Sequence, residues 1–157
     1  MKRPKLAVTN IDKPIAELVN KTNHKTLAIW AADCAERVLP YFEEKYLEDT
    51  RPRKAIEACR EWARTGVFRM ADVRKTALAA HAAARDVKED NAARSAARAA
   101  GQALATAHVP AHALAAAIYA ATAVRNATRS PDADSATTKE RDWQYQHLLK
   151  LTEKLTS

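Results

Sequence analysis

The stretch Asn91–Asn126, NAARSAARAAGQALATAHVPAHALAAAIYAATAVRN, decides the fold class of this chain. Alanine dominates it, and alanine is the strongest helix former because it has no side-chain entropy to lose. Pro110 interrupts the helical pattern, so the stretch forms either two helices or one long helix with a kink. Alanine supplies about three dozen of the 157 residues, which favours closely packed helices over a sheet.

Helical spacing continues on the N-terminal side of this stretch. Thr26 is the candidate N-cap of a helix that Pro40 kinks or ends one turn early. A second helix is expected at 51–66, where Gly66 supplies the C-terminal stop. A third is expected at 70–86, and Asp90 or Asn91 then caps the alanine-rich stretch.

The remaining segments complete the predicted organisation. Residues 1–23 form a basic N-terminal arm with a short helix at about 13–20, and residues 24–157 form a single helical domain. A polar loop is expected at 128–138, followed by a docked amphipathic helix from about 139 to 155. The chain is therefore predicted to be all-α, a single-domain multi-helix bundle or short helical array of about six to seven helices.

The two cysteines are isolated, which argues against a disulfide framework or a zinc ribbon. Each falls on the apolar side of an expected helix, where a reduced thiol behaves as a small hydrophobe. Six side chains are expected to be mostly buried, namely Trp30, Cys34, Phe42, Cys59, Trp62 and Trp143.

The N-terminal segment is basic but lacks the apolar run of ~7–15 residues that a signal peptide needs. The longest uncharged stretch, 111–124, is too short to cross a bilayer. A cytoplasmic protein without a membrane span is expected.

Charge is unevenly distributed along the chain, whose net charge is +7. Residues 26–50 carry six acidic and two basic residues, whereas residues 51–75 carry eight basic and three acidic residues. The arginines of residues 51–64 suit either an acidic partner or phosphates, because the guanidinium presents a fork of donors that fits both. The candidate partner-binding residues are Arg53, Arg60, Arg64, Glu43 and Glu44. The alternative interpretation is a solvated helix face.

Three histidines are the alternative candidates for a metal site. His108 and His112 have the i,i+4 spacing that can place two imidazoles on one face of a helix, and His81 lies on the apolar side of another. Pro110 lies between the first two, however, and the glutamate of a zinc-peptidase motif is absent. A structural role between alanine-rich helices is therefore preferred to a metal site.

No nucleophile elbow, phosphate-binding glycine loop or Ser/His/Asp arrangement is present. The chain contains only two glycines, which argues strongly against a phosphate loop. An enzyme is not expected, and no cofactor is predicted.

Three segments together resemble a known family. They are His24–Gly66, HKTLAIWAADCAERVLPYFEEKYLEDTRPRKAIEACREWARTG; Ala97–Ala120, ARAAGQALATAHVPAHALAAAIYA; and Glu140–Gln144, ERDWQ. This pattern is similar to that of bacterial immunity proteins of polymorphic toxin systems and covers about residues 24–150. The resemblance implies a small helical, non-catalytic protein that binds and neutralises a cognate toxin made by the same cell. It implies no catalytic residues.

The charge of the chain constrains such a partner. A nuclease is usually basic, and a chain of charge +7 would repel it unless the acidic segment made the contact. An acidic or neutral toxin surface is therefore expected. The alternative function is nucleic-acid binding through the N-terminal arm and the arginines of 51–64, although no nucleic-acid-binding motif is present.

Overall fold

The computed structural model describes residues 9–154 and contains only helices there, without a strand. Seven helices of two turns or more and one single-turn helix lie in this range, which confirms the all-α prediction. Their bounds are α1 Asp12–Asn20, α2 His24–Val38, α3 Pro40–Glu43, α4 Arg51–Thr65, α5 Met70–Asp86, α6 Ala92–Ala105, α7 His112–Ala127 and α8 Ala133–Glu153.

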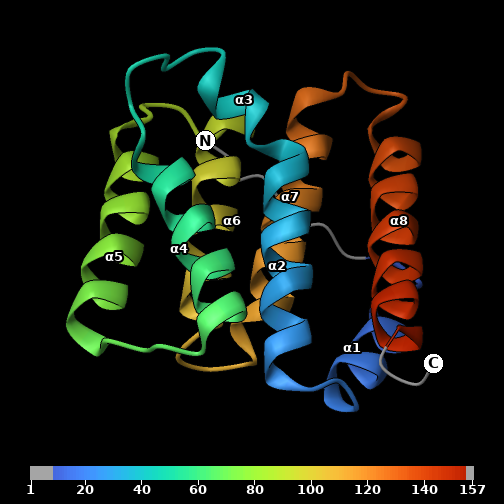
Figure 1. Ribbon diagram of the computed structural model, residues 1–157. Coiled ribbons are helices and arrows are strands. Elements are labelled where there is room, and N and C mark those ends of the chain that lie inside the picture. The colour runs from blue at the N-terminus through green and yellow to red at the C-terminus, as the bar shows by residue number, and fades with distance from the viewer. Residues whose placement is uncertain (1–8, 155–157) are drawn as a thin grey trace.

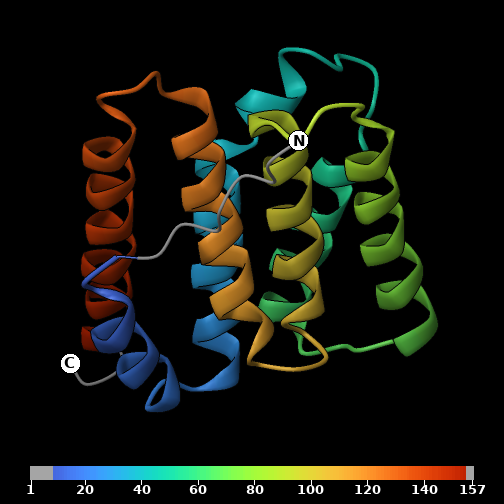
Figure 2. The same ribbon diagram turned by 180° about the vertical axis from the view of Figure 1, so that it is seen from behind.

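The long helices stand side by side as an array (Figure 1). The order across the array runs from α5 through α4 and α6, then α2 and α7, to α8 at the opposite edge. The view from behind shows α6 and α7 next to each other, with α1 crossing the foot of the array beside α8 (Figure 2). The edge helix α5 packs against α4 and α6.

Local sequence signals explain most helix boundaries. Gly66 takes a left-handed conformation at φ 71° and donates its N–H to the carbonyl of Trp62, which ends α4 as predicted. Leu39 separates α2 from α3, which begins at Pro40, so this proline ends α2 as expected. The stretch around Pro110 forms two helices, because the residues between α6 and α7 turn without continuing either helix.

Two predicted boundaries are wrong. The N-cap of α2 is Asn23, whose side chain accepts a hydrogen bond from the N–H of Thr26, so Thr26 lies within the first turn. The segment 128–138 is a loop only in its first part, since α8 begins at Ala133. Its Ser, Thr and Asp residues resemble a loop, but they are tolerated in the first turns of a helix whose later residues dock on the array. Predictions for residues 1–8 lie outside the described residues.

The core is built mainly from alanine. The central helix α6 buries alanines over most of its circumference, and a stripe with Arg94, Arg98 and Gln102 is only partly buried. Larger side chains fill the remaining space, and Trp30, Cys34, Phe42 and Cys59 are buried as predicted. Trp62 and Trp143 are only partly buried and pack at the edge of the core.

Buried polar side chains attach α8 to the array. Arg141 is almost fully buried and binds Asp12 of α1 at 2.6 Å and Gln144 at 2.8 Å. The side-chain amide of Gln144 donates to the carbonyl of Ala117 in α7 at 2.9 Å. The main-chain carbonyl of Gln144 accepts from the indole of Trp30 in α2 at 2.8 Å. Buried polar groups need such partners, so this network defines the position of α8.

The neighbouring residues of α8 add a second attachment nearer the surface. Glu140 accepts two hydrogen bonds from Arg37 of α2, at 2.8 and 2.9 Å. The guanidinium of Arg37 also lies 3.9 Å from the ring centre of Trp143, in a cation–π arrangement. The ERDWQ segment, Glu140–Gln144, therefore serves to dock α8 on three other helices.

Candidate functional site

The acidic and basic segments predicted as a partner surface lie against each other on α2, α3 and α4. Arg53 binds Glu36 and Glu43, each at 2.7 Å, and Arg60 binds Asp33 at 2.7 Å. The hydrogen bonds that Arg53 donates to Glu43, and then those it donates to Glu36, raise the pKa of Arg53. These carboxylates neutralise much of the positive charge of Arg53 and Arg60 within the chain.

The other two candidates on these helices are more open to solvent. Arg64 binds Glu61 of its own helix at 2.5 Å, and both side chains are exposed. Glu44 is also exposed. Arg60 also lies 3.5 Å from Glu36, so this one carboxylate joins Arg60 to Arg53 and Glu43, and Arg64 pairs separately with Glu61.

The three histidines that the sequence singled out line one pocket of about 440 Å³. His81 comes from α5, His112 from the start of α7, and His108 from the turn that joins α6 to α7. Gln102 and Ala105 of α6 complete this side of the pocket. Convergence of the histidines could not be predicted from the sequence, because it depends on the path of the chain around Pro110.

His81 is held as a neutral imidazole at the inner wall of this pocket. Arg98 donates to its Nδ1 at 3.1 Å, and its ring lies so close to Gly101 that a Cβ there would be 2.7 Å from two ring atoms. Burial, followed by the positive charges of Arg98 and Arg85 and by His112, lowers the pKa of His81 to about 4.

The other two histidines make different contacts. His112 donates from Nδ1 to the side-chain oxygen of Gln102 at 2.8 Å, and His108 stacks on Phe68 at 5.8 Å. No group of three His, Cys, Asp or Glu side chains within residues 9–154 is arranged to hold a metal ion. The three histidines share a pocket, but their positions do not form a set of metal ligands.

Exposed apolar side chains surround the histidine pocket. Met70 and Leu78 line it and are 49% and 53% exposed, and Val109, 38% exposed, follows His108 on the turn between α6 and α7. We call this surface the α5 patch. It consists of Met70, Val73, Arg74, Ala77, Leu78, His81, Gln102, Ala105, His108, Val109 and His112.

The α5 patch was not predicted from the sequence. The helical spacing of Met70, Val73, Ala77 and His81 places these four side chains on one face of α5. Ala77 is buried against the array, but Met70 extends beyond it because α5 lies at the edge. In the sequence, Leu78 follows Ala77, and this additional apolar position is the signal that could have revealed a wider apolar stripe on α5.

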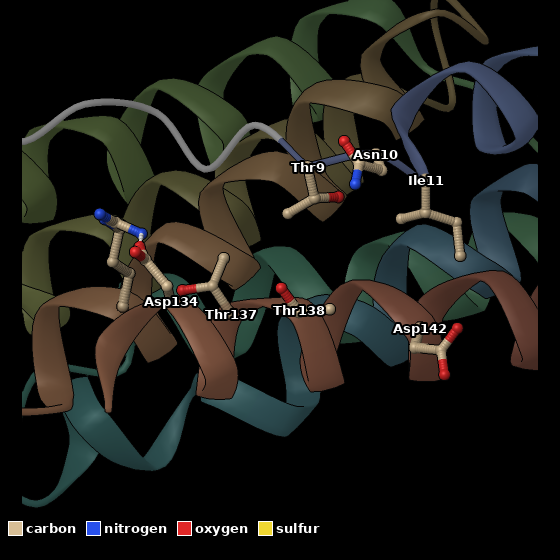
Figure 3. A pocket seen from close by; sticks show the side chains of 8 residues that line it. Thr9, Asn10, Ile11, Asp134, Thr137, Thr138 and Asp142 are labelled. Atoms are coloured by element: carbon tan, nitrogen blue, oxygen red, sulfur yellow. Dashed lines mark hydrogen bonds and ion pairs between the residues drawn. The ribbon is translucent and has the colours of Figure 1, made fainter. Parts of the chain in front are cut away.

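A second pocket, of about 380 Å³, lies between the segment before α1 and the first half of α8 (Figure 3). Its labelled side chains are mainly polar, with Thr137, Thr138 and Asp142 along α8 facing Thr9 to Ile11. Asp134 forms an ion pair with Arg125 at one end of this pocket. The lining residues are Thr9, Asn10, Ile11, Arg125, Asp134, Thr137, Thr138 and Asp142.

The two thiols have no access to a reaction partner. Cys34 and Cys59 are free and buried, as predicted, and burial raises the pKa of both, that of Cys59 to about 12. A thiol in this state is a poor nucleophile because the thiolate is hardly populated. Within the described residues, no helix is long and apolar enough to cross a membrane.

Comparison with known proteins gives one match. Residues 17–151 match the model of a family described as Imm-5 like putative immunity protein. No curated protein and no solved structure matches the chain significantly. The matched range extends from the middle of α1 to the last turn of α8, and so includes the α5 patch and the ERDWQ segment.

Proposed function

We propose that this chain, which belongs to the Imm-5 like putative immunity protein family, is a non-catalytic immunity protein that binds and neutralises a cognate bacterial toxin domain. The protein acts in the cytoplasm of the cell that makes the toxin and protects that cell from it. Family membership over residues 17–151 is the observation that carries this proposal.

The packing of the helices supports an inhibitor that acts by binding. Closely packed alanine helices and a polar network at α8 give a preformed surface, which loses little conformational entropy when it binds a partner. The buried thiols fit a chain that blocks a toxin sterically.

Nucleic-acid binding is the weaker alternative. Phosphate contacts require free cationic side chains, but Arg53 and Arg60 already bind carboxylates of α2 and α3. We therefore favour a protein partner over a phosphate backbone.

Coexpression tests the proposed function. The chain is produced together with the toxin domain encoded by the neighbouring reading frame, and cell survival is compared with that of cells making the toxin domain alone. We expect survival only when both proteins are present, together with copurification of the two chains. Equal killing in both cultures would refute the proposal.

A further inference from the structure

The α5 patch contains exposed apolar side chains, and two of them, Met70 and Leu78, line a pocket. Six of its residues follow one face of α5 at helical spacing, and the large side chains among them stay in contact with solvent at the edge of the array. Contiguous apolar surface of this kind, with polar groups around it, marks interaction sites on soluble proteins. These six residues are Met70, Val73, Arg74, Ala77, Leu78 and His81.

The floor of the pocket can accept a side chain from outside. The pocket is lined by the short side chain of Ala105 and the flexible side chain of Gln102, both on α6. Gly101 has no side chain, so the His81 ring lies directly on the α6 backbone. The volume of about 440 Å³ falls within the range of pockets that enclose bulky ligand groups. A large apolar side chain of a partner would therefore be buried there among the histidine rings.

The charges around this pocket are positive. Arg74 lines it, Arg98 lies behind His81, and no carboxylate is among its described lining residues. Of the acidic residues of α5, Asp86 binds Arg51, and Asp72 lines pockets beside α4, one of which shares Val73 with the histidine pocket. The low pKa of His81 agrees with this positive environment.

We propose that the cognate toxin docks on the α5 patch by inserting an apolar side chain, flanked by carboxylates, into the pocket between His81, His108 and His112. This inference rests on the proposed function and assigns the surface and the chemistry of the partner. Aspartate or glutamate next to the inserted side chain pairs with Arg74, and the inserted side chain covers Met70 and Leu78.

A second copy of this chain fits the patch less well than an acidic partner. A symmetric dimer brings identical surfaces together, so the cationic rim with Arg74 would meet the same rim on the other copy. The net charge of +7 adds a repulsion between two copies at long range.

Matched variants of the full chain test the inference with purified toxin domain, inactivated in its catalytic site. Leu78→Asp places a charge in the patch, and Leu47→Asp makes the same change at an 83% exposed leucine that lies outside it, before α4. We expect Leu78→Asp to weaken binding about 30-fold or more, and Leu47→Asp to change it less than about 3-fold. Both variants should melt like the wild type, since both leucines are largely exposed.

Charge reversal tests the acidic character of the partner. Arg74→Glu should weaken binding about 10-fold or more, and the loss should be smaller at 0.5 M NaCl than at low salt because salt screens the contact. Arg129→Glu, at an exposed arginine between α7 and α8, is the matched control. Binding equal to wild type in Arg74→Glu would overturn the acidic partner.

The outcomes separate the inference from the proposed function. If the wild-type chain binds the toxin domain and Leu78→Asp binds it equally, the surface assignment is wrong and the function stands. Loss of binding in Arg64→Glu but not in Leu78→Asp would place the interface on the α2–α4 surface instead. A wild-type dimer that Leu78→Asp converts to a monomer would assign the patch to self-association. Absence of wild-type binding would refute the function and the inference together.

Discussion

At the residue scale, His81 shows how packing determines a protonation state. Its partly buried ring packs on α6 at Gly101, and the positive charges of Arg98 and Arg85 act on it, so the charged form is disfavoured. A free histidine has a pKa near 6.5, whereas His81 titrates at about 4. A neutral ring can pack against apolar groups at ordinary pH, which the α5 patch requires.

The lowered pKa predicts how stability depends on pH. Between about pH 6.5 and 4 the unfolded chain gains a proton at His81 that the folded chain does not bind, so the free energy of unfolding falls as pH decreases through this window. Urea unfolding at pH 7 and pH 5 should show a larger loss in the wild type than in His81→Gln. In NMR, the Cε1–H signal of His81 should remain unshifted down to about pH 5. A midpoint near 6.5 would contradict the enclosed position of the ring.

At the element scale, α2 and α4 illustrate why site residues were harder to predict than helices. The sequence places acidic and basic residues on two neighbouring helices, but their pairing depends on how the helices face each other. The ends of α4 and α5 agree with the sequence because proline, glycine and periodicity act locally. The start of α8 differs because its docking residues stabilise a helix that begins in a loop-like sequence.

Arg53 provides the prediction at this scale. Arg53→Glu removes two ion pairs and places a carboxylate beside Glu36 and Glu43, so it should lower the free energy of unfolding by about 1–2 kcal/mol. Arg64→Glu affects one exposed pair within α4 and should lower the free energy of unfolding less than Arg53→Glu does. Urea denaturation at low salt measures both values. The difference should shrink in 0.5 M NaCl, and equal effects of the two variants would contradict the bridging position of Arg53.

At the scale of the whole molecule, alanine content predicts the fold class but not the arrangement. Alanine supplies helical propensity and permits close approach, yet its small side chain offers few distinctive contacts from which to deduce neighbours. The convergence of three histidines and the buried network of Arg141 and Gln144 are long-range features of this kind. Neither follows from local spacing.

Close alanine packing has a measurable consequence for α6. Ala100 of α6 is fully buried, so Ala100→Leu should overpack the helix contacts and lower the free energy of unfolding by about 1–3 kcal/mol. Ala127→Leu, at the exposed end of α7, adds the same atoms in open space and should change it by less than about 0.5 kcal/mol. Thermal denaturation followed by circular dichroism compares the two. If Ala100→Leu left the stability unchanged, α6 would have unfilled space beside Ala100.

The ion pair between Asp12 and Arg141 joins residues 129 positions apart, and this separation bears on the order in which the protein is completed during synthesis. When α1 leaves the ribosome, its arginine partner has not yet been translated. The alanine-rich helices α4 to α7 can pack with near neighbours in the growing chain, whereas closing the long loop between α1 and α8 is slow and entropically costly. The surfaces of α2 and α7 that α8 covers therefore remain open until α8 itself has been synthesised, and docking of α8 is the step that covers them.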